Sequence, residues 1–170
     1  MSVLRALGLT AVILLAVVLQ VAVFSALSFE GVVPNLALLV VVAAALVRGP
    51  NFAAVVGFLS GLAIDLAPPA DHVAGRWALA LIVVGYLAGR VRHDAGTSAV
   101  AAVVTVAACS FVGTSVFALS GMLLDDPAIP VGEALRVIPV AVLYDVLVTP
   151  FLLPLLLRLF RRLQPHRVAY

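Results

Sequence analysis

The sequence predicts an all-α integral membrane protein, a bundle of six transmembrane helices forming a single domain over residues 1–170. The first observation behind this is composition: 65% of the residues are hydrophobic and only 11% are charged, against roughly a quarter charged in soluble domains. The second is a series of apolar stretches, several of them near the roughly 20 residues that a helix needs to cross a bilayer. The third is that most charges lie in short segments between these stretches. Together they exclude an ordinary soluble protein.

The first predicted span covers residues 6–28, twenty-three residues in which Gln20 is the only strongly polar one. The apolar part of a cleavable signal peptide is shorter, about 7–15 residues, so we interpret this stretch as an uncleaved span. The second span, 32–47, begins near Pro34 and ends at an Arg-Gly-Pro sequence. The third, 51–67, ends at two consecutive prolines, which a helix cannot continue through. Because the break at 48–50 is short, a re-entrant pair formed by the second and third stretches remains an alternative to two full spans.

The fourth predicted span, 74–91, ends in a group of basic residues. The fifth, 98–124, is too long for a hydrocarbon core of ~30 Å at ~1.5 Å per residue, so it should tilt or protrude. The sixth, 137–160, contains three prolines that make it irregular and free carbonyl groups for other contacts. A basic tail follows it.

The arginines predict the orientation. All ten basic residues are Arg, and with six spans eight of them fall on the side that holds both termini. Arg76 and Arg136 fall on the other side, together with most of the acids. Because cytoplasmic loops carry an excess of basic residues, both termini are expected in the cytoplasm.

Small residues recur at four-residue spacing in spans three to five. Gly57 and Gly61 form one such pair, and Gly85 and Gly89 form another. In lipid, helices associate by close backbone approach at small residues. We therefore expect these glycines to pack helices together within the bundle, or alternatively against a partner's helix.

Two acids lie within apolar stretches. Asp65 ends the small-residue face of span three, and Asp145 lies about 12 Å into span six. A carboxylate inside a membrane costs roughly 2.5–3.5 kcal/mol on insertion scales and should face the bundle interior with a partner. The candidate partners are Arg76 and Arg136. Three interpretations remain open: a structural ion pair or polar plug, an outward-opening ligand pocket, and a catalytic aspartyl dyad as in the lipoprotein signal peptidase.

No motif supports catalysis. The residues around each Asp differ from the signal peptidase motifs, and the chain has no nucleophile elbow, zinc-protease motif or phosphate loop. We expect a protein that is not an enzyme and that holds no cofactor and no metal.

The C-terminal segment is basic. It should attract the anionic inner leaflet by about 1 kcal/mol per Arg near the surface, or alternatively dock an acidic cytoplasmic partner. Binding of nucleic acid is not expected, because the cluster is short and held against the bilayer. The basic residues of this tail are Arg158, Arg161, Arg162 and Arg167.

Two segments resemble a known family. Residues 57–66 read GFLSGLAIDL, and residues 84–92 read VGYLAGRVR. Together with the Pro-Asn-Leu at 34–36 and the Arg-Gly-Pro at 48–50, they resemble the rod shape-determining protein MreD family. Only residues 34–92 carry motifs of any specificity; the remaining spans match by hydropathy and position.

The resemblance implies a non-enzymatic scaffold subunit of the bacterial cell-wall elongation machinery, which supports lateral peptidoglycan synthesis and rod shape. It also implies a multi-pass protein of the bacterial cytoplasmic (inner) membrane. Its implied partners are the bitopic MreC and, beyond it, MreB, RodA and a class B penicillin-binding protein. It also implies a fold similar to the substrate-binding subunits of energy-coupling-factor transporters. A vitamin-binding subunit of such a transporter is therefore the alternative function.

Overall fold

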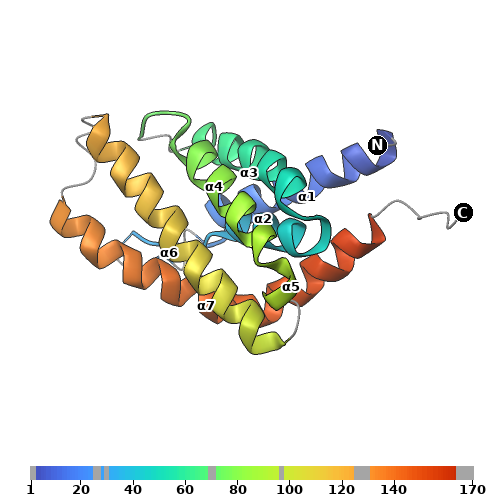
Figure 1. Cartoon of the computed structure of the whole chain (residues 1–170). Coiled ribbons are helices and arrows are strands. Elements are labelled where there is room, and N and C mark those ends of the chain that lie inside the picture. The colour runs from blue at the N-terminus through green and yellow to red at the C-terminus, as the bar shows by residue number, and fades with distance from the viewer. Residues whose placement is uncertain are drawn as a thin grey trace, which may run out of the picture.

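The computed structural model describes residues 3–24, 28, 31–68, 72–95, 98–124 and 131–163, with side chains of the last segment described from residue 135. These residues form a helical bundle without β-strands (Figure 1). Its helices are α1 (Val3–Ala22), α2 (Leu36–Arg48), α3 (Pro50–Asp65), α4 (Arg76–Arg90), α5 (Arg92–Ala95), α6 (Ala99–Leu123) and α7 (Val131–Arg162).

Three of these helices, α1, α6 and α7, are long and apolar enough to cross a membrane. The helices α2, α3 and α4 have 13, 16 and 15 residues. At 1.5 Å per residue they are about 20–24 Å long, shorter than a hydrocarbon core of roughly 30 Å. The fold thus includes three helices of full spanning length, and the count of six spans remains a prediction.

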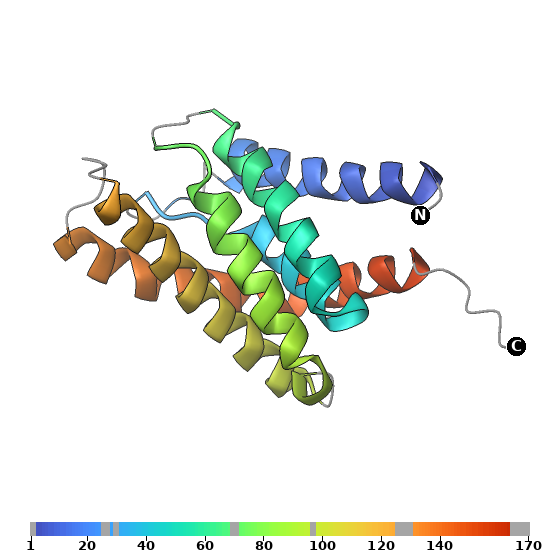
Figure 2. The same ribbon diagram turned by 45° about the horizontal axis from the view of Figure 1, so that its top comes forward.

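The helix α2 is the core of the molecule. Each of its residues from Leu36 to Ala45 is buried, as expected for a helix that is hydrophobic on all sides. It contacts α1, α3, α4, α6 and α7, and both views show it inside the bundle (Figures 1 and 2). The predicted second span began at residue 32, but residues 31–35 precede the helix, because Asn35 caps its N-terminus.

A single residue, Gly49, joins α2 to α3. Its φ of +89° is a conformation that glycine adopts without steric cost. Pro50 follows at the first position of α3, where its missing N–H needs no partner. The Arg-Gly-Pro sequence thus ends one helix and starts the next within one residue.

The N-terminal end of α1 and the C-terminal end of α7 lie at the same end of the bundle (Figures 1 and 2). Gly8 of α1 lies against the side chain of Leu163, which follows α7. The guanidinium of Arg92 lies beside Gly49 at the α2–α3 turn. We call this the arginine-rich end, and the end with Asp65 and the N-terminus of α4 the opposite end.

Candidate functional site

Polar side chains gather around the N-terminus of α2, inside the bundle. Asp145 of α7 is only 1% exposed. Its Oδ1 accepts a hydrogen bond from the backbone N–H of Asn35 at 2.6 Å, and its Oδ2 accepts one from the hydroxyl of Ser110 at 2.6 Å. We call the residues around this carboxylate the α2-cap cluster; its members are Gln20, Asn35, Ser110 and Asp145.

The other members of the α2-cap cluster satisfy further N–H groups of the helix. The side-chain oxygen of Gln20, from α1, accepts from the N–H of Ala37 at 3.2 Å. The side-chain oxygen of Asn35 accepts from the N–H of Leu38 at 2.9 Å. The first N–H groups of a helix have no partner within it, and burying them unsatisfied is costly. The cluster therefore allows α2 to begin inside the protein.

The expected arginine partner of Asp145 is not Arg136. Arg136 is exposed near the N-terminus of α7, nine residues before Asp145 and so about 13 Å away from it along the helix axis. The observed hydrogen bonds to Asp145 come from neutral donors instead. A backbone N–H at a helix N-terminus carries a partial positive charge, so it can stabilise a carboxylate without a full countercharge.

Asp65, at the end of α3, caps a second helix. Its Oδ2 accepts from the N–H groups of Gly75 and Ala78 at 2.9 and 3.1 Å. Its Oδ1 accepts from the N–H of Trp77 at 3.1 Å and contacts His72 Nε2 at 2.9 Å. Gly75 precedes α4 and has no side chain to cap it. Asp65 and Asp145 thus each cap a helix other than their own.

Arg76 is buried at the opposite end of the bundle. Its guanidinium lies 4.0 Å from the centre of the Phe117 ring, and its Nη2 donates to the carbonyl of Phe117 at 2.8 Å. Trp77 stacks on the same ring at 4.4 Å. Gly121 makes room for the guanidinium, because a Cβ there would overlap it. Neither Phe117 nor Gly121 was singled out by its sequence, since both are ordinary residues of an apolar helix.

A cavity of about 300 Å³ lies over the α2-cap cluster. Besides apolar residues from the segment before α2, its lining includes Gln20, Asn35, Trp77, Thr114 and Asp145. Its volume is at the lower limit of small-molecule sites, which are about 300–1,000 Å³. Within the described ranges, no group of three or more His, Cys, Asp or Glu residues is arranged to hold a metal ion.

The four glycines lie in the interface between α3 and α4. A Cβ at Gly57 would overlap the backbone of Leu81, and one at Gly61 would overlap Ala78. A Cβ at Gly85 would overlap the backbone of Ala53 in the same way. These glycines therefore bring the two backbones into direct contact, within the chain. Gly89 does the same against Pro50.

The basic tail begins within α7. Arg158, Arg161 and Arg162 are exposed at the arginine-rich end, while Arg167 lies outside the described residues. Gln20 was the one member of the α2-cap cluster that stood out in the sequence, as the only strongly polar residue of its stretch. Its hydrogen bond to the N–H of Ala37 could not be predicted from the sequence.

We compared the chain with models of known protein families, with curated proteins and with solved structures, and none of the three comparisons found a match.

Proposed function

We propose that this chain is a non-enzymatic membrane scaffold of the MreD type, which supports lateral cell-wall synthesis and rod shape in a bacterium. The observation that carries the proposal is the resemblance of residues 57–66 and 84–92 to that family. The glycines of these two segments are also the ones that bring α3 and α4 together. The motif residues thus have a packing role, which fits a protein that works by binding.

The environment of the two acids supports a scaffold over an enzyme. Both oxygens of Asp65 and both oxygens of Asp145 accept hydrogen bonds from helix N-termini or from neighbouring side chains. A catalytic carboxylate must present an oxygen to substrate or water at hydrogen-bond distance. Here those oxygens already serve the start of α2 and the start of α4.

We further propose six spans with both termini in the cytoplasm. The helix α2 is about 20 Å long, and the five residues 31–35 before it add up to about 16 Å when extended, enough together for a core of roughly 30 Å. Non-helical backbone at membrane depth is tolerated where it is buried in protein or lines a cavity, and residues of this segment line the cavity over Asp145. Slight thinning of the bilayer accommodates α3 and α4.

The cavity over the α2-cap cluster favours a second candidate, the vitamin-binding subunit of an energy-coupling-factor transporter. Its lining combines an aromatic side chain, Trp77, with the polar groups of Gln20, Asn35 and Asp145. We rank this function second, because the cavity is small and its polar oxygens are largely engaged in capping α2.

Affinity purification in mild detergent tests the primary proposal. We expect an MreC-like bitopic protein to remain bound through extraction, as mass spectrometry of the purified material would detect. Depletion of the chain should disturb cell-wall elongation and produce rounded or widened cells.

The same depletion experiment separates the two candidate functions. A vitamin-binding subunit would give a growth defect that added vitamin rescues, with normal cell shape throughout. That result, together with copurification of an ATPase instead of an MreC-like protein, would reject the scaffold function.

A further inference from the structure

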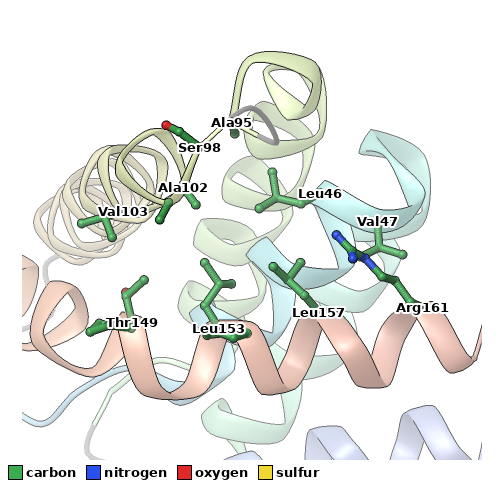
Figure 3. Close-up of a pocket in the computed structure, with 13 residues that line it drawn as sticks. Leu46, Val47, Ala95, Ser98, Ala102, Val103, Thr149, Leu153, Leu157 and Arg161 are labelled. Carbon is green, nitrogen blue, oxygen red and sulfur yellow. The ribbon is translucent and has the colours of Figure 1, made fainter.

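A groove runs between α6 and α7 towards the arginine-rich end (Figure 3). It has a volume of about 590 Å³. The end of α2 and the last residue of α5 complete its walls. The side chains that line it are mainly apolar, among them Leu46, Val103, Leu153 and Leu157.

The groove has the depth of one leaflet. Along α7 its lining extends from Thr149 to Arg161, which is about 18 Å at 1.5 Å per residue. Half of a hydrocarbon core of roughly 30 Å is about 15 Å. Thr149, at the inner end, is buried and donates its hydroxyl hydrogen to the carbonyl of Asp145. If α6 and α7 cross a bilayer, a groove of this length reaches from the arginine-rich surface to about its middle.

Arg161 gives the groove a positive charge at its outer end. Among the described residues that line it, Arg161 is the only charged one, and in Figure 3 its guanidinium extends across the groove towards Val47. A second apolar groove, of about 470 Å³, lies between α4 and α6. Its lining includes both Arg90 and Asp94, so its charges balance. Of these two grooves, only the first is complementary to an anion.

The length, lining and charge of the groove favour a lipid chain over a helix. A helix with its side chains is at least about 10 Å wide. A single hydrocarbon chain is far thinner than a helix. An apolar channel of leaflet depth with one cation at the headgroup level matches the shape and charge of a lipid.

We propose that this groove binds one acyl chain of an anionic phospholipid, whose phosphate pairs with Arg161. The acyl chain lies along Leu157 and Leu153 towards Thr149, and the headgroup stays at the arginine-rich surface. Arginine is well suited to phosphate, because its planar guanidinium forms paired hydrogen bonds. The proposal requires only that α6 and α7 cross the bilayer, and it does not depend on any protein partner.

Native mass spectrometry of the delipidated full-length chain tests the proposal. Phosphatidylglycerol and phosphatidylethanolamine with identical acyl chains are added to the same detergent solution. We expect the first bound lipid to be phosphatidylglycerol with about fivefold preference, the factor that corresponds to roughly 1 kcal/mol for one basic residue near the surface. Arg161→Gln should remove the preference, and Val103→Trp, which fills the groove, should remove the first bound lipid.

Two matched variants serve as controls. Arg90→Gln makes the same change of charge in the other groove, and Val104→Trp adds the same bulk to the neighbouring residue, which lines that other groove. Both should keep the preference of the unmodified chain. The proposal is rejected if Arg90→Gln reduces the preference for phosphatidylglycerol as much as Arg161→Gln does. Any arginine at the surface would then attract the anionic lipid equally. It is also rejected if Val103→Trp keeps the first bound lipid. Loss of a single-pass protein partner from that variant during affinity purification would then show that the groove binds a helix.

Discussion

Asp145 has two different donors, a backbone N–H on one oxygen and a hydroxyl on the other. In Asp145→Asn, the remaining oxygen can accept from Asn35, and the new amide group can donate to Ser110, whose hydroxyl is able to reverse its role. We therefore expect Asp145→Asn to lower the free energy of unfolding by less than about 1 kcal/mol. Asp145→Leu leaves the N–H of Asn35 buried without an acceptor and should cost about 1–3 kcal/mol.

Thermal unfolding in detergent measures both variants of Asp145. The Asn variant should melt close to the unmodified protein and the Leu variant clearly below it. Equal melting temperatures for the two variants would show that the hydrogen bond to α2 contributes nothing.

The same substitution at Asp65 should be more harmful. Both oxygens there face backbone N–H groups of Gly75, Trp77 and Ala78, and a backbone N–H cannot act as an acceptor. An amide group in Asp65→Asn would point its own donors at those donors, at a cost of about 1–3 kcal/mol. The melting temperature of Asp65→Asn should therefore fall below that of Asp145→Asn, and the reverse order would contradict the capping role of Asp65.

The partners of the two acids could be predicted only in part from the sequence. The cost of a charge in lipid predicted that Asp65 and Asp145 would have partners. It did not predict which partners, since an arginine and the N–H groups of a helix terminus both stabilise a carboxylate. The N–H of Asn35 is 110 residues from Asp145 in the chain, and no local pattern encodes that contact.

The pairing of α3 and α4 depends on the absence of four Cβ atoms. Gly61→Ala would place a methyl group into the backbone of Ala78, and we expect a loss of about 1–3 kcal/mol from overpacking. Gly113→Ala is the matched control. Its new methyl would meet only the side chains of Val84 and Leu38, at 3.0 and 3.4 Å, and alanine has the higher helix propensity.

Thermal unfolding in detergent compares these two variants. Gly61→Ala should lower the melting temperature more than Gly113→Ala. Equal effects would mean that α3 and α4 can separate slightly without loss of stability.

The sequence predicts where a helix begins and ends better than it predicts whether that helix faces lipid or protein. Gly49-Pro50 and the charged residue Arg90 mark helix ends that periodicity and turn chemistry predict. Hydropathy does not distinguish a helix that faces lipid from one that faces protein, because both are apolar. The helices α1 and α2 are similarly hydrophobic, yet Leu14 and Leu15 of α1 are exposed while the middle of α2 is buried.

At the scale of the whole molecule, the proposed orientation predicts which residues reagents reach. Cys109 is the single cysteine of the sequence, so Cys109→Ser should give a background that does not react with maleimide. In that background, Ala74→Cys at the opposite end should react with a membrane-impermeant maleimide in intact cells. His93→Cys at the arginine-rich end should react only after lysis, because that end faces the cytoplasm in the proposed topology.

Both residues are exposed in the structure, so labelling of lysed cells provides the accessibility control for each. Labelling of His93→Cys in intact cells, with Ala74→Cys protected, would reverse the proposed orientation.

The capping of α2 by α7 also fixes an order of events during synthesis. Asp145 follows Asn35 by 110 residues, so a ribosome makes α2 well before it makes the acceptor for the N–H of Asn35. An unsatisfied backbone group in hydrocarbon costs several kcal/mol. Until α7 is made, the N–H of Asn35 lacks this acceptor, so the buried position of α2 is fully stabilised only when α7 packs against it. Placement of α2 in the core is consequently a late step of assembly, which follows the synthesis of α7.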